Sequence, residues 1–564
     1  MLVFSRASPH TTPTRRRFLH LPGLTGPSLA WFSPSWMQRV SSSSRVGQQA
    51  APAKITVDVD ARVSTIDRKI YGHFTEHFGR CIYGGIFEEG SSLSDEQGYR
   101  KDVLDVARQL RVPVLRWPGG NFAASYHWSD GIGPKDQRPR KFDPAWFAEE
   151  SNHFGTDEYI AYCRKLGAEP YVCVNMGTGT IEEAAAWVEY CNGTTNTQYA
   201  NLRRKYGNPE PYNVKYWGLG NEVWGDFNAG RKGAGEYARQ ALELAKMMKW
   251  VDPSIKLIAC GSYAASDLDW DRQVLETLYD VADYISMHVY VGGDDYYGLL
   301  GSARLFEERI RALDGVIGAV LGKNRTPRFV FGFPPRKDRI QIAVDEWNIW
   351  YRVRNGRDRN VTSKQEERYN LRDALWTASI LNLFQRSSST VTMANLNQLV
   401  NVLAPIITSK EGLFLQSIYF PFRLYVEHCG NIALDTRTIS PTFTTNSQAA
   451  VTYNARTMAE NIVLPYLDAQ ATVDDDARFV SLAVVNRHRD QNIRTTIQVQ
   501  GSPALGREGM VFEINGTSPE AENSFNGPEN VTIKNRKESI FGKSFQYEFP
   551  AHSVSLLKMQ LSSG

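Results

Sequence analysis

The stretches "VKYWGLGNE" (214–222) and "IQIAVDEWN" (340–348) decide the fold class. Each is a short apolar run that is rich in β-branched and aromatic residues and ends in Asn, Asp or Glu. Runs of this length without alternation are typical of strands buried on both faces, as in a parallel sheet. Six further runs of the same kind occur at 69–77, 112–121, 169–177, 256–262, 283–290 and 390–398.

Helical patterns separate these runs. Residues 235–251 carry apolar side chains at helical spacing, and Pro253 follows. Thr156 and Gly167 bound a second helix as its cap and its stop, and 180–193 repeats that arrangement. Strands alternating with helices predict a (β/α)₈ TIM barrel. A doubly wound sheet is the alternative. A glycine-rich phosphate-binding turn after the first strand is typical of that fold, and none is present there.

The chain divides into four segments by composition. Residues 1–53 hold six Arg and no acid, so we interpret them as a targeting or linker segment. We expect residues 54–68 to form an N-terminal strand that joins the β domain, and residues 69–432 to form the barrel. Short alternating runs over 433–564 predict an all-β sandwich, jelly-roll-like in outline.

Charge and cysteine content exclude several classes of protein. Without residues 1–53 the body has 58 Lys and Arg against 61 Asp and Glu, which argues against a nucleic-acid surface. The sequence contains no run of 18 apolar residues, so we expect no membrane-spanning helix. The six Cys show no metal-site spacing, and we expect buried free thiols. We expect the partner to be a neutral small molecule or polymer.

In a TIM barrel the site lies at the carboxyl ends of the strands. Glu222 and Glu346 each end a strongly apolar strand, where a charge needs a partner or a purpose. Two opposed carboxylates are what glycoside hydrolysis requires. The alternative is that both are structural ion-pair partners. The remaining polar residues of this predicted ring are Glu76, Arg116, Asn121, Asn175, Asn221, Ser262, His288, Tyr290, Asn348 and Gln398.

Aromatic residues beside the ring suit a sugar, because its C–H face packs on aromatic planes. They are Phe74, Trp117, Trp224, Trp347 and Trp350.

"HFTEH" (73–77) also matches the pattern of inverted zinc peptidases, whose two His must share one face of a helix. Flanking glycines and strand-like residues make a helix there improbable. We therefore expect Glu76 to bind substrate hydroxyls, and His288 to orient the nucleophile or the substrate.

Several long motifs together resemble the α-L-arabinofuranosidases of glycoside hydrolase family 51, in clan A. They include "IYGHFTEHFGRCIYGGIFE", "RWPGGNFAASYHWSDGIGP", "WGLGNEVWG", "AVDEWNIWY" and "NQLVNVLAPI". The resemblance runs from about residue 54 to 430 and continues more weakly through the β domain.

The resemblance implies retaining, exo-acting hydrolysis of terminal α-L-arabinofuranosyl groups by double displacement, without cofactor or metal. Glu222 would be the acid/base and Glu346 the nucleophile. It also implies a homo-oligomer, often a hexamer. The expected sugar-binding residues are Glu76, Asn121, Asn221, His288, Tyr290, Gln398 and Trp350, with Arg116 and Phe74 in support.

Three stretches depart from the resemblance. The residues after the sixth strand ("VGGDDYYGLLGSARLFEER") lack landmarks, and those near 323–338 look like an insertion. The arginine-rich segment implies export if it is a signal, and a cytoplasmic location otherwise. An endoglucanase or β-xylosidase of the same clan, and a non-catalytic carbohydrate-binding protein, remain as alternatives.

Overall fold

A computed structural model describes residues 52–263, 266–324, 338–351, 365–446, 461–502 and 504–561. The expected targeting segment, apart from its last two residues, lies outside this range, as does the expected insertion from residue 325 to 337. Among the described residues, no helix is long and apolar enough to cross a membrane.

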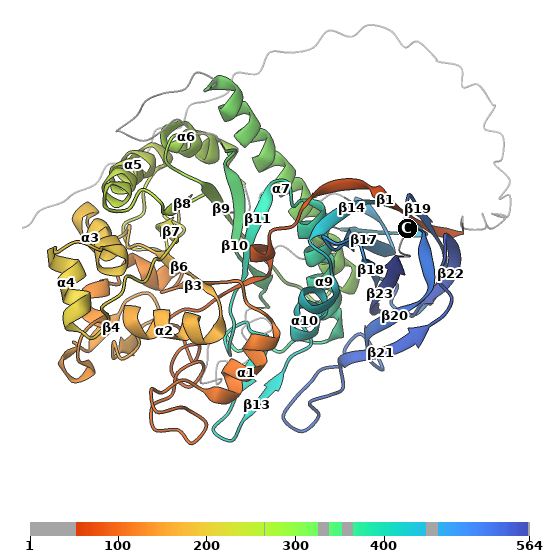
Figure 1. Ribbon diagram of the computed structural model, residues 1–564, viewed down its shortest axis with the longest axis horizontal. Helices are drawn as coiled ribbons and strands as arrows, with labels where there is room; N and C mark the ends of the chain where they lie inside the picture. The colour runs from red at the N-terminus through yellow and green to blue at the C-terminus, as the bar shows by residue number, and fades with distance from the viewer. Residues whose placement is uncertain are drawn as a thin grey trace, which may run out of the picture. The chain divides into compact units, whose positions relative to one another are not determined.

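Eight parallel strands close into a barrel in the order β10–β11–β2–β3–β6–β7–β8–β9, which confirms the predicted TIM barrel (Figure 1). The strands are β2 (Gly72–Phe74), β3 (Val114–Trp117), β6 (Glu169–Cys173), β7 (Tyr216–Leu219), β8 (Lys256–Ala259), β9 (Tyr284–Val291), β10 (Gln341–Ile349) and β11 (Val391–Leu396). A small cluster of inward-facing side chains fills the barrel beneath the strand ends. It consists of Val114, Tyr171, Tyr216, Ile258, Ala343 and Met393.

Helices surround the barrel and carry its largest apolar core on the faces that they turn to the strands. They are α1 (Lys101–Gln109), α2 (Thr156–Leu166), α3 (Ile181–Asn192), α4 (Gln198–Lys205), α5 (Ala234–Val251), α6 (Leu268–Leu278), α7 (Tyr296–Lys323), α9 (Leu371–Arg386) and α10 (Tyr419–His428). Short 3₁₀ turns are η1 (Arg68–Tyr71), η2 (Asn121–Ala124), η3 (Trp128–Gly131) and η4 (Lys135–Gln137).

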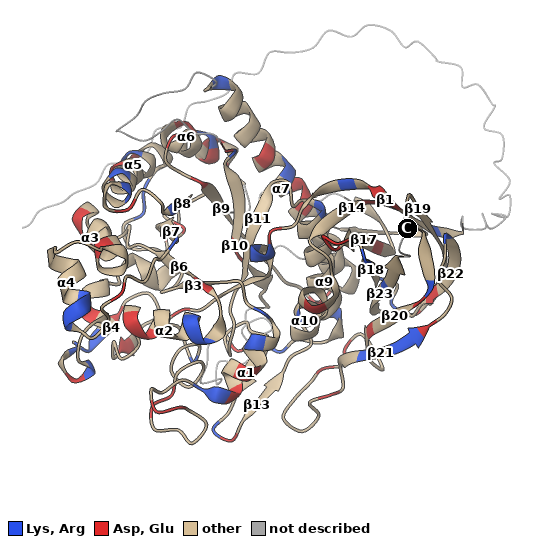
Figure 2. Cartoon of the chain, in the orientation of Figure 1, with Lys and Arg blue, Asp and Glu red and all other residues tan. Residues whose placement is uncertain are grey.

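One local prediction about these helices was wrong. Gly155, not Thr156, is the N-cap of α2, and Thr156 is the first helical residue. Its hydroxyl accepts a hydrogen bond from Trp187 Nε1 instead. The stretch after the sixth strand is mostly helix: Asp295 caps α7, on which acidic and basic residues alternate in ion pairs such as Arg304–Glu308 (Figure 2).

The β domain takes its strands from both ends of the chain. β1 (Ala53–Thr65) pairs antiparallel with β14 (Ile432–Ile439) and parallel with β19 (Ile493–Gln500). The sheet has nine strands, and the others are β17 (Leu467–Val473), β18 (Phe479–Asn486), β20 (Leu505–Asn515), β21 (Thr532–Glu538), β22 (Ser544–Phe549) and β23 (Ser553–Leu561).

Strands near opposite edges of this sheet share one apolar core, because Val511 of β20 and Phe549 of β22 belong to the same cluster. The sheet therefore folds over itself into two layers, as in a sandwich. Three hairpins complete the described structure: β4 (Lys141–Asp143) with β5 (Ala148–Glu150), β12 (Ile406–Thr408) with β13 (Leu413–Leu415), and β15 (Thr442–Asn446) with β16 (Asn461–Pro465).

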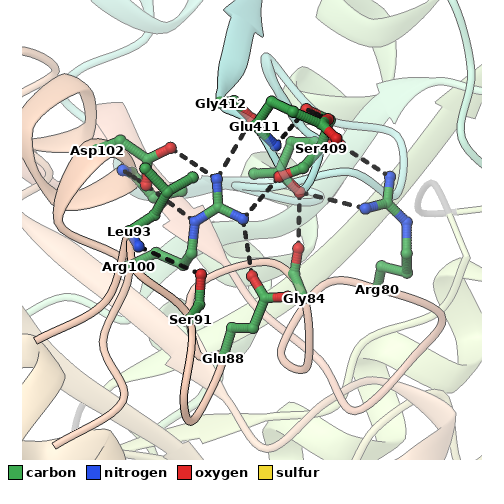
Figure 3. A network of polar contacts seen from close by, with 12 residues as sticks. Arg80, Gly84, Glu88, Ser91, Leu93, Arg100, Asp102, Ser409, Glu411 and Gly412 are labelled. Carbon is green, nitrogen blue, oxygen red and sulfur yellow. Dashed lines mark hydrogen bonds and ion pairs between the residues drawn. The ribbon is translucent and has the colours of Figure 1, made fainter. Parts of the chain in front are cut away.

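Arg100, directly before α1, fastens the hairpin β12–β13 to the barrel. Its guanidinium donates to the carboxylates of Glu88 and Asp102, at 2.9 and 2.6 Å, and to the backbone carbonyls of Ser409 and Gly412, at 2.9 and 3.3 Å (Figure 3). Its Nε–H also donates to Asp102 Oδ1, at 2.9 Å, so all five donors of this buried side chain are satisfied. The side chain ties together segments some 300 positions apart in the sequence.

Candidate active site

A cavity of about 430 Å³ opens at the carboxyl ends of the barrel strands. Its volume falls in the range of small-ligand sites. Of the predicted site residues, it brings together Glu76, Asn121, Glu222, Tyr290, Glu346, Trp350 and Gln398.

Glu222 and Glu346 face each other in this cavity. Glu346 lies within β10, and Glu222 lies three residues after the end of β7 with a left-handed backbone, φ +42°. One carboxylate oxygen of each and one nitrogen of His288 all lie within 4.8 Å of one another. A non-glycine residue in this conformation costs free energy, and such residues cluster at active sites.

Hydrogen bonds fix both oxygens of Glu346. Arg116 Nη1 donates to Oε1 at 2.6 Å, and the Tyr290 hydroxyl donates to Oε2 at 2.7 Å. The backbone also approaches closely here, because a Cβ on Gly120 would lie only 2.9 Å from Glu346 Oε1. The glycine therefore leaves room for the carboxylate, whose orientation is set from two sides.

His288 lies behind the cavity wall and contacts three carboxylates. Its Nδ1 lies 3.0 Å from Glu222 Oε1 and 3.5 Å from Glu346 Oε2, and its Nε2 lies 3.3 Å from Asp345 Oδ1. Burial lowers the pKa of His288, but the charges of Glu346, Asp345 and Glu222 outweigh it and raise the pKa to about 10. The ring is therefore an imidazolium near neutral pH.

The pKa of Glu222 is raised because burial disfavours its charged form, and the charge of Glu346 adds to the effect. The hydrogen bond and charge of His288 oppose this rise. A carboxyl whose proton is held above its usual range suits the acid/base role.

Glu76 sits in a separate set of donors at the cavity wall. Its Oε1 accepts from Phe122 N at 3.2 Å and Trp146 Nε1 at 2.9 Å, and its Oε2 accepts from Gln398 Nε2 at 3.3 Å. Burial, followed by the charge of Glu346, raises the pKa of Glu76 to about 8. Gln398 Oε1 in turn accepts from Glu76 N at 3.0 Å, so the two side chains hold each other.

Asn221, His288, Arg116 and Phe74 do not line the cavity but lie behind it. Arg116 Nη2 donates to Asn221 Oδ1 at 2.7 Å, and its guanidinium stacks 4.6 Å from the Phe74 ring centroid. Asn221 Nδ2 has no hydrogen-bond partner in the described part of the chain. Arg116 and His288 therefore orient the carboxylates that reach the cavity and carry the charges beside them. Asn221 and Phe74 hold the Arg116 guanidinium in place.

Two groups of residues carry side chains of the metal-binding type. Glu222, His288 and Glu346 lie within 4.8 Å of one another, where His288 Nδ1 already contacts both carboxylates, at 3.0 and 3.5 Å. In "HFTEH", His73 lies on strand β2 and not on a helix. His77 Nε2 accepts from Trp117 Nε1 and its Nδ1 lies 2.8 Å from Glu150, so both of its nitrogens are engaged.

Sequence reasoning missed Trp146, Phe78 and Asn397, which all line the cavity. Trp146 lies in the turn of the β4–β5 hairpin, and its ring stacks on Phe78 with centroids 3.8 Å apart. This turn is far in the sequence from the end of any barrel strand, so no local signal marked Trp146. Asn397 follows β11 directly and donates to the Tyr290 hydroxyl; its position one residue before Gln398 was the available signal.

Comparisons with known proteins agree with this geometry. Two family models match: "Alpha-L-arabinofuranosidase 1 domain" over residues 106–303 and "Alpha-L-arabinofuranosidase C-terminal domain" over residues 345–553. A probable alpha-L-arabinofuranosidase C of Aspergillus clavatus is 39% identical over 531 residues, covering 92% of this chain and 99% of that protein.

The chain belongs to the α-L-arabinofuranosidases of glycoside hydrolase family 51. Within this family, the alpha-L-arabinofuranosidase of Thermotoga maritima, solved as an arabinose complex, is 44% identical with a TM-score of 0.81, covering 90% of this chain and 100% of that one. An intracellular exo-alpha-(1->5)-L-arabinofuranosidase of Halalkalibacterium halodurans is 38% identical, covering 78% of this chain and 86% of that protein.

Proposed function

We propose that the protein is a retaining, exo-acting α-L-arabinofuranosidase that releases terminal arabinofuranosyl groups from arabinose-containing polymers or oligosaccharides. The observation that carries the proposal is the pair of facing carboxylates, whose nearest oxygens lie within 4.8 Å. Retaining glycosidases hold their carboxyl groups about 5–5.5 Å apart, whereas inverting ones leave room for a water between them.

In the first step Glu222 donates its proton to the leaving glycosidic oxygen while Glu346 Oε2 or Oε1 attacks the anomeric carbon. The C–O bond to the leaving group breaks, and an ester bond to Glu346 forms. In the second step Glu222 takes a proton from water, the water oxygen attacks the same carbon, and Glu346 is released. The raised pKa of Glu222 keeps its proton available for the first step.

Glu76 and Gln398 are placed to bind the hydroxyls of the arabinose. A carboxyl with a pKa near 8 retains its proton at neutral pH and can therefore donate as well as accept. Asn121 and Trp350 line the same cavity and complete the sugar-binding wall. The expectation of a homo-oligomer stays a prediction.

A panel of nitrophenyl glycosides tests the proposal. The purified protein should hydrolyse p-nitrophenyl α-L-arabinofuranoside and leave the β-D-xylopyranoside and β-D-glucopyranoside largely intact. Proton NMR during the reaction should show the α anomer of arabinose first. A preference for xylosyl or glucosyl substrates would favour a β-xylosidase or endoglucanase, and initial release of the β anomer would overturn retention.

A further inference from the structure

The β4–β5 hairpin forms one wall of the arabinose cavity, yet its strands bury no apolar side chain. Its turn, residues 144–147, lines the cavity. Of the six residues in the two strands, four are exposed, and the two buried ones are both carboxylates, Asp143 and Glu150. Asp143 accepts from Ala145 N and Trp146 N, at 2.9 and 3.2 Å, and so shapes the turn from within. Other contacts must therefore set the place of the hairpin on the barrel.

Three consecutive residues that follow the first barrel strand hold this hairpin. Glu76 Oε1 accepts from Trp146 Nε1 at 2.9 Å, and Phe78 stacks on the Trp146 ring with centroids 3.8 Å apart. His77 lies between them in the sequence, and its Nδ1 is 2.8 Å from Glu150 Oε2. The hairpin is thus fastened at its turn by Glu76 and Phe78, and at its base by His77.

The second partner of His77 decides which ring nitrogen carries the hydrogen. Trp117 Nε1 donates to His77 Nε2 at 3.1 Å, and an indole N–H can only donate. Nε2 is therefore an acceptor, and Nδ1 carries the hydrogen that it donates to Glu150. The ring also stacks on Phe122, with centroids 4.6 Å apart and planes 19° from parallel. These contacts fix the ring in one orientation and one tautomer.

Glu150 is the group that this place in the fold requires. Its Oε1 accepts from the Tyr83 hydroxyl at 2.5 Å and from Asn152 N at 2.6 Å. Only 8% of its side chain is exposed, so its charge depends on these donors and on His77. All three partners donate, and an ionised carboxylate is a side chain that only accepts.

We propose that His77 and Glu150 are positioning residues, whose hydrogen bond holds Trp146 against Glu76 and thereby shapes the sugar-binding wall of the cavity. The inference rests on the proposed function, since neither residue lines the cavity and both act through the hairpin. The second His of "HFTEH" thus has a role in the geometry of the sugar site.

Glu150→Gln tests this hydrogen bond with almost no change in volume. The amide has one acceptor oxygen and one donor group, so at least one of the three donors loses its partner. If His77 moved its hydrogen to Nε2, that N–H would face the indole N–H of Trp117. We expect kcat/KM for p-nitrophenyl α-L-arabinofuranoside to fall about tenfold, mainly through KM, because the wall contacts the sugar before any bond breaks.

Glu149→Gln is the matched control, because it makes the same change at the neighbouring position of the same strand. Glu149 pairs with Arg140, but 62% of its side chain is exposed, and exposed pairs contribute little to stability. The kcat/KM of this variant should match that of the wild type. An equal loss in the two variants would overturn the proposal.

A double-mutant cycle traces the effect to Trp146. Trp146→Phe keeps an aromatic ring beside Phe78 but removes the donor to Glu76. If the hairpin carries the effect, adding Glu150→Gln to Trp146→Phe should lower kcat/KM by less than about twofold. Full additivity of the two losses would mean that Glu150 does not act through Trp146, and the proposal would be wrong.

Two substitutions of His77 give a second test that leaves Glu150 in place. Asn can offer an amide N–H near the position of Nδ1, and Gln an amide oxygen near that of Nε2. His77→Asn should therefore retain more activity than His77→Gln, and equal or reversed activities would contradict the proposal. An unchanged kcat/KM in Glu150→Gln would also contradict it, while the wild-type activity on the aryl arabinofuranoside still supported the proposed function. A wild-type protein inactive on that substrate would show that the proposed function itself is wrong.

Discussion

Two buried arginines of this protein each meet two carboxylates, yet they belong to different kinds of site. Arg116 and Arg100 are equally buried, with 1% of each side chain exposed. Arg116 contacts Glu346 at 2.6 Å and Asp345 at 3.7 Å. Arg100 contacts Asp102 at 2.6 Å and Glu88 at 2.9 Å. Charge pairing alone therefore does not tell a catalytic cluster from a structural one.

The difference lies in what surrounds each pair. The other donors of Arg100 go to two backbone carbonyls in the turn between β12 and β13. Around Arg116, three more titratable groups, Glu76, Glu222 and His288, act on the carboxylates, and the cavity opens among them. Several buried carboxyl groups therefore interact with one another beside a cavity, although burying them costs free energy. Such a group of acids with shifted pKa values is typical of a functional site.

The most severe test of the comparison removes one carboxylate from each cluster. Glu346→Ala should lower kcat on the order of 10⁵-fold, about 7 kcal/mol of barrier, because the nucleophile is lost. Azide should restore part of the activity by taking the nucleophile's place. Steady-state kinetics with p-nitrophenyl α-L-arabinofuranoside, with and without azide, measure both effects.

Asp102→Ala is the matched variant at the structural cluster. It should reduce thermal stability and leave kcat nearly unchanged, since the hydrogen bonds of Asp102 within the described residues go to Arg100 and to Val103 N at the start of α1, away from the cavity. Comparable loss of kcat in both variants would mean that the two clusters do not differ as argued.

The sequence predicted the catalytic cluster better than the structural one for a physical reason. His288 and Glu346 lie among the last four residues of β9 and β10, and Glu222 lies three residues beyond β7. Barrel closure brings these carboxyl-terminal parts of the strands to one rim. Arg100 and Ser409 meet through the folding of a hairpin whose place no periodicity encodes. Trp146 likewise reaches the site from a hairpin turn, within the long connection between β3 and α2, so its position could not be predicted from periodicity either.

The next test removes the arginine of the structural cluster. Arg100→Ala leaves Glu88 and Asp102 without their counter-charge, and the carbonyls of Ser409 and Gly412 each lose one donor. Breaking a buried pair in this way costs about 3 kcal/mol. We expect the free energy of unfolding to fall by that amount in urea titrations, with kcat retained in the folded fraction.

Arg272→Ala is the control for this variant. Arg272 also meets two carboxylates, Asp269 at 2.7 Å and Glu276 at 3.0 Å, but 45% of its side chain is exposed. Exposed pairs contribute roughly 0–1 kcal/mol, so its loss should be barely measurable. Equal destabilisation by the two variants would show that burial of Arg100 does not set its contribution.

The smallest expected effect concerns His288, which has no counterpart near Arg100. Its pKa of about 10 keeps it charged while Glu222 titrates, and its charge and hydrogen bond lower the pKa of Glu222. His288→Gln removes that charge, so burial and the charge of Glu346 raise the pKa of Glu222 further, against the opposing charge of Arg116. The alkaline limb of the kcat/KM profile should therefore move upward, by about one pH unit or 1.4 kcal/mol.

Stability gives this variant an independent readout with a definite sign. A His whose pKa rises on folding from 6.5 to about 10 stabilises the protein fully below pH 6.5, and this contribution disappears as pH rises through 10. The wild-type protein should thus lose stability relative to His288→Gln across that window. His428→Gln is the control: burial lowers the pKa of His428 to about 4, so that residue is already neutral there. An alkaline limb that moves downward in His288→Gln would contradict the electrostatic role assigned to the imidazolium.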